Sequence, residues 1–257
     1  MIVEGLEYIV TPCQPWSRRA GFLYQMIALR ARYRRNKVAW KSHIEACHNF
    51  VIKAAEMTDN NGRAIVLGSG LLIETPISYL ANKFREVILV DAIHGIPERC
   101  RMRKYKNVNM VEADISGIIN NFSRNSHSKF DISKFEYKYD LAISSNMLSQ
   151  IPLYLHDALN TMKLGCNEET IKRRAIIDHI ITIKSISHHH CLISDYEHYI
   201  TNNELIVDTK DLLYGIMLPP PSETWTWNLA LRPELFQNKD VYSRVGAWVD
   251  INDMALS

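Results

Sequence analysis

Short apolar runs alternate with amphipathic stretches through the middle of the chain. The apolar runs predict buried strands at 64–68, 86–91, 107–112, 139–144 and 190–194. Apolar residues recur at helical spacing at about 74–84, 96–105, 152–163 and 168–187. Short buried strands that alternate with helices are typical of a parallel sheet covered on both faces. The pattern therefore predicts an α/β fold.

The N-terminal part has a different pattern. Residues 1–16 contain Pro12 and Pro15, which predict an irregular or extended lead-in because proline interrupts a helix. Helical spacing of apolar residues then predicts one helix within 17–41 and another at about 38–57. We expect this end of the chain to add helices to the α/β fold.

The C-terminal part again has the pattern of strands. Segments 224–231 and 241–251 alternate between apolar and polar residues, which predicts an antiparallel pair at the edge of the sheet. The polar, aperiodic segment 120–137 predicts a surface insertion. We therefore divide the chain into an N-terminal helical extension, 1–62, and an α/β domain, 63–257.

Composition and charge narrow the classes of function. Of the 257 residues, 47% are apolar and 23% are charged, which is typical of a globular protein. The formal net charge of +2 makes no electrostatic case for a nucleic-acid or membrane partner. No apolar run approaches the roughly 18 residues that span a bilayer. The opening MIVEGLEYIV lacks a basic segment like that of a secretory signal. We expect a cytoplasmic protein.

Cysteine and histidine spacing gives no metal site. The five cysteines are scattered and never spaced as CxxC, so free thiols are expected. His43, Cys47 and His48 share a helical neighbourhood but have no second cluster of ligands. The run 188–190 consists of three histidines at the start of a predicted strand, where neighbouring side chains face opposite sides. We expect no bound metal.

The segment 64–91 carries the most specific pattern in the chain. A predicted strand runs into the turn Gly68-Ser69-Gly70, a helix follows, and a second strand ends on Asp91. Glycines let a ligand approach the backbone, a helix N-terminus offers N–H groups, and a carboxylate there can hold a ribose. A tight turn without a ligand is the alternative. A dinucleotide turn would require glycine where Ile73 stands.

Four motifs in this order resemble the class I S-adenosylmethionine-dependent methyltransferases over about 65–248. They are VLGSG at 66–70, Asp91 in VILVD, Asp114 in VEAD, and SSNMLSQIP at 144–152. With WKSH at 40–43, they resemble a bacterial group within that family most closely. The resemblance implies a Rossmann-like three-layer sandwich. Its mostly parallel, seven-stranded sheet would end in an antiparallel C-terminal hairpin.

The resemblance also implies a cofactor, S-adenosylmethionine, and the residues that hold it. The methionine portion would meet the backbone of the glycine turn, and Asp91, followed by Ala92, would accept the ribose hydroxyls. Asp114 would contact the adenine amino group, with Ile115 near the ring. Ser144 would line the floor beside the sulfonium. The implied cofactor-binding residues are Gly68, Ser69, Gly70, Asp91, Ala92, Asp114, Ile115 and Ser144.

The chain departs from the family pattern at two positions of this turn. Val66 stands where the family carries an acidic residue, and Leu72 stands where it carries a third glycine. Glu74, six residues past Gly68, is a candidate to supply the missing charge near the amino group of the cofactor. These departures concern the placement of the cofactor more than the fold.

Three residues are candidates for catalysis at the acceptor side. Asn146 follows the fourth predicted strand, and Asp195 follows the fifth, at the carboxyl end of the sheet where α/β folds bind ligands. The alternative to a catalytic role is that Asp195 only stabilises a cap or a turn. His43 could be a general base, because the pKa of histidine lies near neutrality, or it could be purely structural.

The expected acceptor is a small molecule. The sequence SSNM at 144–147 does not match the Asn-Pro-Pro-aromatic signature of enzymes that methylate the amino groups of bases or glutamine. An RNA-modifying enzyme is one alternative, which would bind phosphates through Arg30, Arg32, Arg34 and Arg35. The other alternative is a non-catalytic binding or scaffold protein on the same fold. No membrane partner is expected.

Overall fold

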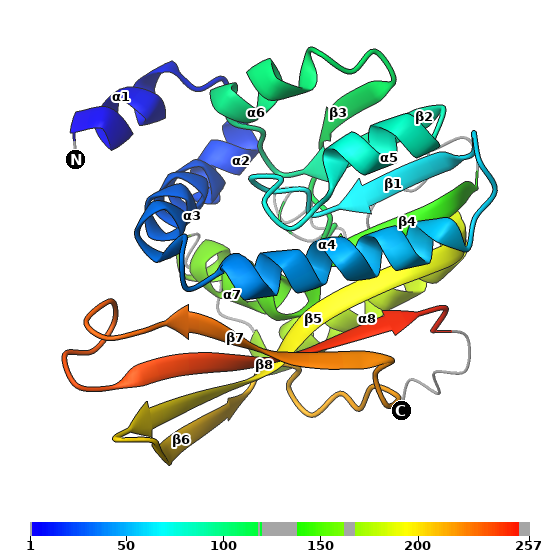
Figure 1. Ribbon diagram of the computed structural model, residues 1–257. Coiled ribbons are helices and arrows are strands. Elements are labelled where there is room, and N and C mark those ends of the chain that lie inside the picture. The colour runs from blue at the N-terminus through cyan, green and yellow to red at the C-terminus, as the bar shows by residue number, and fades with distance from the viewer. Residues whose placement is uncertain (1, 118, 120–137, 162–167, 252–257) are drawn as a thin grey trace.

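A single mixed sheet forms the centre of the protein (Figure 1). The computed structural model describes residues 2–117, 119, 138–161 and 168–251. The strands within these residues are β1 (Arg63–Leu67), β2 (Glu86–Asp91), β3 (Val108–Glu112), β4 (Tyr139–Ser145), β5 (Ser187–Asn202), β6 (Leu205–Asp211), β7 (Glu223–Ala230) and β8 (Asp240–Val249). Their order is β3-β2-β1-β4-β5-β8-β7, and β6 pairs only with β5.

The strand directions confirm the predicted fold class, but the sheet has eight strands among the described residues instead of the predicted seven, because β6 is added as a hairpin partner of β5. The five strands β1 to β5 run parallel to their neighbours among these five. Strand β8 is antiparallel to β5, and β7 is antiparallel to β8. A parallel sheet that ends in an antiparallel C-terminal hairpin is the arrangement expected of the Rossmann-like methyltransferase fold. The predicted insertion 120–137 lies outside the described residues.

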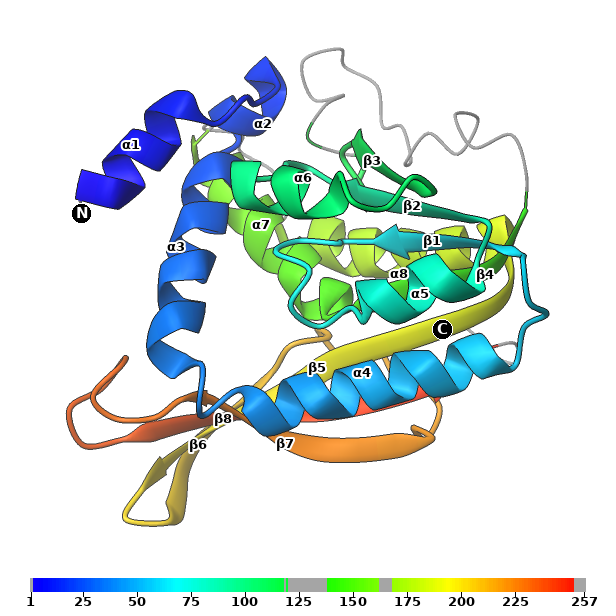
Figure 2. The same cartoon turned by 45° about the horizontal axis from the view of Figure 1, so that its top comes forward.

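Helices cover both faces of the sheet (Figures 1 and 2). Their bounds are α1 (Ile2–Val10), α2 (Pro15–Arg19), α3 (Phe22–Asn36), α4 (Lys41–Glu56), α5 (Ile77–Lys83), α6 (Ile96–Met102), α7 (Met147–Thr161) and α8 (Glu168–Ile186). Side chains of β1 alternate, so Ile65 and Leu67 join the core with α7 and α8. Ala64 and Val66 join the opposite core with α4 and α5. None of the described helices has the length and apolar character needed to cross a membrane.

The N-terminal lead-in is helical, so the prediction of an irregular segment over 1–16 was wrong. Pro12 follows the end of α1, and Pro15 occupies the first turn of α2, where its missing N–H is not needed. After Gly21, α3 lies across the carboxyl ends of the parallel strands (Figure 2). This placement makes α3 the roof over the end of the sheet.

Two element boundaries differ from prediction in ways that matter for the site. The helix predicted at 74–84 begins at Ile77, so 68–76 form an irregular loop that ends on Pro76. The helix predicted at 152–163 begins earlier, directly after Asn146, and contains Pro152. Both changes alter which backbone groups face the carboxyl end of the sheet.

Strand β5 is much longer than the predicted 190–194. It continues to Asn202 and turns back into β6 through Asn203 and Glu204, which have φ of 48° and 68°. Two successive residues with positive φ are typical of a tight hairpin turn. The sequence gives little sign of this turn, because neither position is glycine.

Candidate functional site

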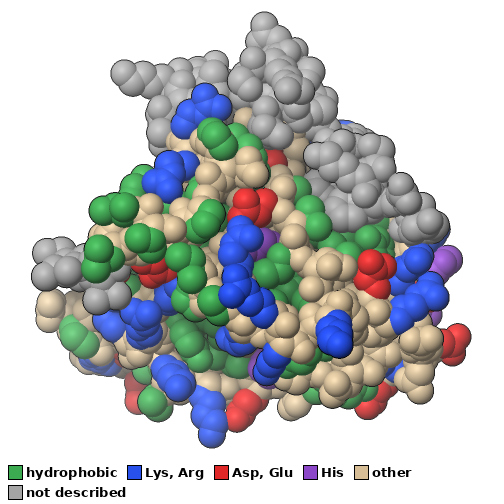
Figure 3. Space-filling model, turned by 90° about the horizontal axis from the view of Figure 1, so that it is seen from above, with side chains coloured by type: hydrophobic (Ala, Val, Ile, Leu, Met, Phe, Trp, Pro, Cys, Tyr) green, Lys and Arg blue, Asp and Glu red, His purple; other side chains and the backbone are tan. Residues whose placement is uncertain are grey.

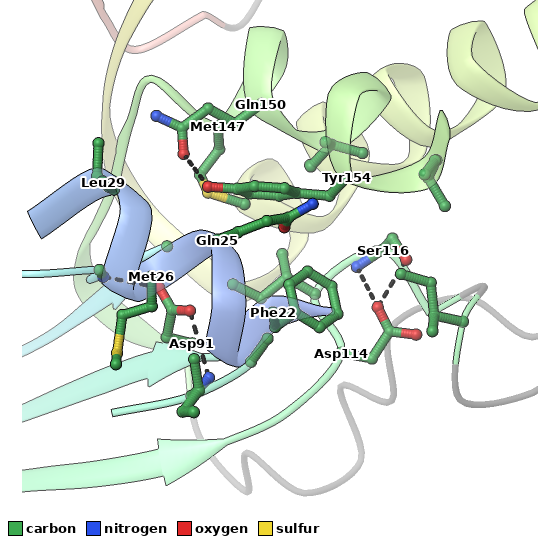
Figure 4. Close-up of a pocket in the computed structure, with 18 of the residues that line it drawn as sticks. Phe22, Gln25, Met26, Leu29, Asp91, Asp114, Ser116, Met147, Gln150 and Tyr154 are labelled. Atoms are coloured by element: carbon green, nitrogen blue, oxygen red, sulfur yellow. Dashed lines mark hydrogen bonds between the residues drawn. The ribbon is translucent and has the colours of Figure 1, made fainter. Parts of the chain in front are cut away.

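A pocket lies at the carboxyl ends of β1, β2 and β3, beneath α3 and beside α7 (Figure 4). We call it the β1–β3 pocket. Its walls come from α3 (Phe22, Gln25, Met26, Leu29), from the strand ends (Gly68, Gly70, Leu71, Asp91, Ala92, Ile93, Asp114, Ile115, Ser116, Ile119) and from α7 (Met147, Gln150, Ile151, Tyr154, Leu155). Six of the eight predicted cofactor-binding residues therefore line one pocket.

The glycine turn and Asp91 form one hydrogen-bonded unit. The amides of Gly68 and Ser69 donate to the carbonyl of Val90 at 2.9 and 3.1 Å. The amide of Gly70 donates to Oδ2 of Asp91 at 2.7 Å. The expectation that a helix N-terminus at this turn offers free N–H groups was wrong, because these amides have partners and α5 begins only at Ile77.

Asp91 presents a half-buried carboxylate at the end of β2. Burial raises the pKa of this carboxyl group, and the charge of His94 and backbone donors such as Gly70 oppose the rise. The Ile93 amide also points to Oδ1, at 3.5 Å. The carboxylate is thus held in place by backbone groups, with its acceptor atoms at the pocket wall.

Asp114 lies across the pocket from Asp91 and is 8% exposed. Its Oδ1 accepts hydrogen bonds from the Ser116 amide at 3.1 Å and the Ser116 hydroxyl at 2.6 Å. These local bonds orient the carboxylate two residues after β3, with Ile115 beside it in the wall. The predicted pair of carboxylates is therefore in the pocket.

The charge of the β1–β3 pocket selects among ligands. Among the described residues, its lining contains the two carboxylates of Asp91 and Asp114 and no lysine or arginine. Such a lining favours groups that donate hydrogen bonds or carry positive charge and disfavours phosphates. The nearby hydroxyl of Ser69 is buried and has no hydrogen-bond partner among the described residues.

Ser144 lies outside the pocket, contrary to the expectation that it lines the floor. Its hydroxyl is 2.8 Å from Nε2 of His179 on α8. Neighbouring residues of β4 face opposite sides of the sheet, so Ser144 faces α8 while Ser145 faces α4. Burial lowers the pKa of His179 to about 3, so this imidazole is neutral.

A second group of polar side chains meets near the same end of the sheet. We call it the Glu74 cluster; it consists of His43, Glu74, Ser145, Asn146 and Trp225. Oε1 of Glu74 lies 2.9 Å from Nδ2 of Asn146 and 3.2 Å from Nε2 of His43. Oε2 accepts from the Ser145 hydroxyl at 3.2 Å, and the Trp225 indole donates to Nδ1 of His43 at 3.0 Å. Glu74 has the only side chain in the cluster from the loop after β1.

All three predicted catalytic residues belong to one network. His43 is fully buried and stacks on Trp227 with ring centroids 4.0 Å apart. Oδ1 of Asn146 accepts from the amide of Asp195 at 3.3 Å. The Asp195 carboxylate is bonded to His198, at 3.2 Å, and to the hydroxyls of Ser149 and Ser243. Its acceptor atoms are thus engaged by the fold.

The β1–β3 pocket and the Glu74 cluster are electrostatically connected through α7. Burial, followed by the negative charges of Asp91 and Glu74, raises the pKa of the Tyr154 phenol, which lines the pocket. Asn146 of the cluster directly precedes Met147 of the pocket.

Within the described residues, no three His, Cys, Asp or Glu are arranged as metal ligands.

Residues of α3 and α7 complete the pocket, and sequence reasoning missed them. The rings of Phe22 and Tyr154 meet edge to face at 5.5 Å, and Gln25 donates to Asp157 at 2.7 Å. Met147 packs so closely over Gly68 that a Cβ on Gly68 would lie 1.9 Å from its sulfur. These side chains leave only about 70 Å³ of space for water-sized molecules.

Helix α3, which carries Arg30, Arg32, Arg34 and Arg35, does not present all four arginines to solvent. Arg30 is buried and paired with Glu7 and with Glu98. Arg35 pairs with Glu234 at 2.6 Å. Two of the four arginines suggested for phosphate binding thus have carboxylate partners.

Comparisons with known proteins found solved structures that resemble this chain at low sequence identity. No family model and no curated protein matches the chain. The N-methyltransferase NodS from Bradyrhizobium japonicum, solved with S-adenosylhomocysteine, is 10% identical over 80% of this chain and 86% of its own, with a TM-score of 0.38. The 1,6-didemethyltoxoflavin-N1-methyltransferase of Burkholderia thailandensis is 11% identical over 86% and 89%, with a TM-score of 0.37.

An rRNA methylase from Streptococcus thermophilus is also similar, at 10% identity over 78% of this chain and 93% of its own, with a TM-score of 0.34. One of these three methyltransferases was solved with 1,6-didemethyltoxoflavin bound, and another is an rRNA methylase. The function proposed below takes its support from the strand order and the pocket residues of this chain.

Proposed function

We propose that this protein binds S-adenosylmethionine in the β1–β3 pocket and transfers its methyl group to a small-molecule acceptor. One observation carries the proposal: Asp91 at the end of β2 and Asp114 after β3 face one pocket, and no basic side chain lines it in the part of the chain that the structure describes. The sheet order that creates this pocket is the one expected for class I methyltransferases.

The donors of an adenosyl group suit the acceptors of the pocket. Ribose hydroxyls can donate to Asp91, and an adenine amino group can donate to Asp114. The uncharged turn and the two carboxylates also suit a cationic sulfonium. A dinucleotide fits less well, because its phosphates would meet no lysine or arginine of the described lining and the amides of the glycine turn already have partners.

The cofactor would supply an activated methyl group, and the Glu74 cluster would act on the acceptor. Glu74 is the proton acceptor that the geometry favours, because its side chain is 21% exposed while His43 is fully enclosed. We assign positioning roles to His43 and Asn146, which donate to Glu74. Asp195 would hold Asn146 through the backbone of β5.

Two alternatives have less support. An RNA acceptor would use the arginines of α3, of which Arg30 and Arg35 are paired with carboxylates. A non-catalytic scaffold accounts for Val66 and Leu72 in the turn, but it gives no role to the paired carboxylates of the pocket.

Calorimetry with S-adenosylhomocysteine tests the proposal directly. We expect saturable binding to the wild-type chain, no binding of NAD, and a loss of at least about tenfold in affinity for Asp91→Asn, which removes a charged acceptor. The exposed Asp59→Asn is the matched control and should bind as wild type. Absence of both heat and thermal shift with S-adenosylhomocysteine would make the scaffold the leading interpretation.

We also propose a reducing compartment, the cytoplasm, as the location. Cys13, Cys47, Cys100 and Cys191 are all free thiols. Free thiols are usual where glutathione and thioredoxin keep cysteines reduced.

A further inference from the structure

A second cavity opens on the other side of the loop that follows the glycine turn. It has a volume of about 370 Å³, within the range of roughly 300–1,000 Å³ found for small-molecule sites. We call it the Arg101 cavity. Its polar walls come from α4, from the loop and α5, and from the end of α6: His48, Thr75, Ser78, Arg101, Lys104 and Tyr105. Leu71 lines the β1–β3 pocket, whereas its neighbour Leu72 lines this cavity.

The two cavities have opposite charge. Among the residues that the structure describes, the Arg101 cavity is lined by the cations of Arg101 and Lys104 and by no carboxylate. The described lining of the β1–β3 pocket contains Asp91 and Asp114 and no cation. Helix α6 lies on the face seen in Figure 3, over which lysine and arginine side chains are spread. The Arg101 cavity therefore favours an anion where the β1–β3 pocket disfavours one.

Several contacts fix the donors of the Arg101 cavity. Nη2 of Arg101 donates to the carbonyls of Leu71 and Leu72 at 3.0 and 3.3 Å, which holds the guanidinium against the loop. The hydroxyls of Ser78 and Tyr105 are 2.7 Å apart. Nζ of Lys104 lies 4.8 Å from the centre of the Tyr105 ring.

The titration of Tyr105 is consistent with a positive field in the cavity. Its hydrogen bonds with Ser78 and Lys104 lower the pKa of the phenol, and the charges of Lys104 and Arg101 lower it further. Cations that favour a phenolate at this position also favour other oxyanions that are bound beside it.

We propose that the Arg101 cavity binds the phosphate group of a compact phosphate monoester. Arg101 and Lys104 supply the charge, and one hydroxyl of the hydrogen-bonded pair Ser78 and Tyr105 supplies a further donor. Arg and Lys side chains form short, charge-assisted hydrogen bonds with phosphate oxygens. The volume of the cavity favours a small molecule over a nucleic-acid strand, which needs an extended basic groove. The site is independent of the methyl-transfer proposal.

Calorimetric titration of the full chain with phenyl phosphate at constant ionic strength tests the site. We expect saturable binding, and no binding of phenol, which lacks the phosphate. Lys104→Gln should weaken phenyl phosphate binding about tenfold or more. Arg103→Gln is the matched control, because Arg103 is exposed at the same end of α6 and does not line the cavity. Affinity for S-adenosylhomocysteine should be unchanged in Lys104→Gln.

Three results would overturn the site. They are absence of saturable phenyl phosphate binding, an equal loss in Arg103→Gln and Lys104→Gln, or binding of a short single-stranded RNA that phenyl phosphate does not displace. Arg101→Gln also removes bonds to Leu71 and Leu72 and could unfold the loop. Lys104→Gln and Ser78→Ala keep those bonds, so they test the site even if Arg101→Gln is unstable.

Discussion

The indole N–H of Trp225 donates to Nδ1 of His43, with 3.0 Å between the nitrogens. An indole nitrogen is a donor only, so Nδ1 must be unprotonated and the proton of the neutral imidazole must be on Nε2. Nε2 in turn faces Glu74 at 3.2 Å. Trp225, on β7, thus determines which nitrogen of His43, on α4, carries the proton. With that proton on Nε2 and the Nδ1 lone pair occupied by Trp225, His43 cannot accept a further hydrogen bond.

We expect Trp225→Phe to destabilise the fold by about 1–3 kcal/mol beyond the loss of packing, because it leaves a buried imidazole nitrogen unpaired. Chemical denaturation measures the change in the free energy of unfolding. Nitrogen NMR of the wild-type chain should show His43 with its proton on Nε2, and this tautomer preference should weaken in the variant.

A double-mutant cycle isolates that hydrogen bond from packing. In a His43→Leu background, Trp225→Phe should cost less than in the wild type, with a coupling of roughly 0.5–3 kcal/mol. Equal costs in both backgrounds would mean that packing alone accounts for the effect.

Binding of S-adenosylhomocysteine should weaken as the pH falls. Burial raises the pKa of Asp91, so its carboxylate becomes protonated at a higher pH than an exposed aspartate. The protonated group is a poorer acceptor for ribose hydroxyls, and affinity falls by up to about tenfold per pH unit below that pKa. Calorimetry across a pH series measures this change in affinity. Asp91→Asn should lack this dependence, and a slope that persists in the variant would assign it to another group.

Gly68→Ala should destabilise the chain by about 2 kcal/mol or more. Gly68 has φ of 75°, which costs about 1–2 kcal/mol for a residue with a Cβ, and the new methyl would collide with Met147. Thermal denaturation measures the effect. Gly5→Ala is the control: Gly5 lies in α1 with open space around it, so the helix should be unaffected or gain stability. Adding Met147→Ala to Gly68→Ala should relieve the collision but not the backbone strain.

His179 should make the protein sensitive to acid. Its pKa in the folded state is about 3, below the usual value of 6.5, so the unfolded chain binds the proton more tightly. The stability that this residue contributes is present above pH 6.5 and is lost as the pH falls towards 3, by up to about 1.4 kcal/mol per pH unit. Urea unfolding at a series of pH values measures it. His179→Gln should flatten the profile, whereas the exposed His188→Gln should not.

The sheet and the positions of Asp91 and Asp114 could be predicted because both depend on local sequence. Buried strands such as 86–91 appear as unbroken apolar runs, and the residue that ends such a strand necessarily lies at the carboxyl edge. The same logic brought Asn146 and Asp195 together, because their strands β4 and β5 are neighbours.

The remaining parts of the site depend on contacts between distant segments. Phe22 and Tyr154 meet only because α3 crosses the end of the sheet, and no local pattern encodes that crossing. The predicted role of Ser144 failed by one position, since a side chain one residue along a strand faces the opposite layer. Glu74 could be singled out by its type, but its partners His43 and Trp225 come from both ends of the chain.

The narrowness of the β1–β3 pocket has a kinetic consequence. Its free space of about 70 Å³ is well below the roughly 300 Å³ of small ligand sites, because Phe22 and Met147 extend into it. A ligand can enter only after Met147 and the Phe22 end of α3 move aside. Observed association rates should therefore level off at high ligand concentration, at the rate of that opening. The same motion would limit release, so the residence time of the ligand would be set by α3 as much as by Asp91.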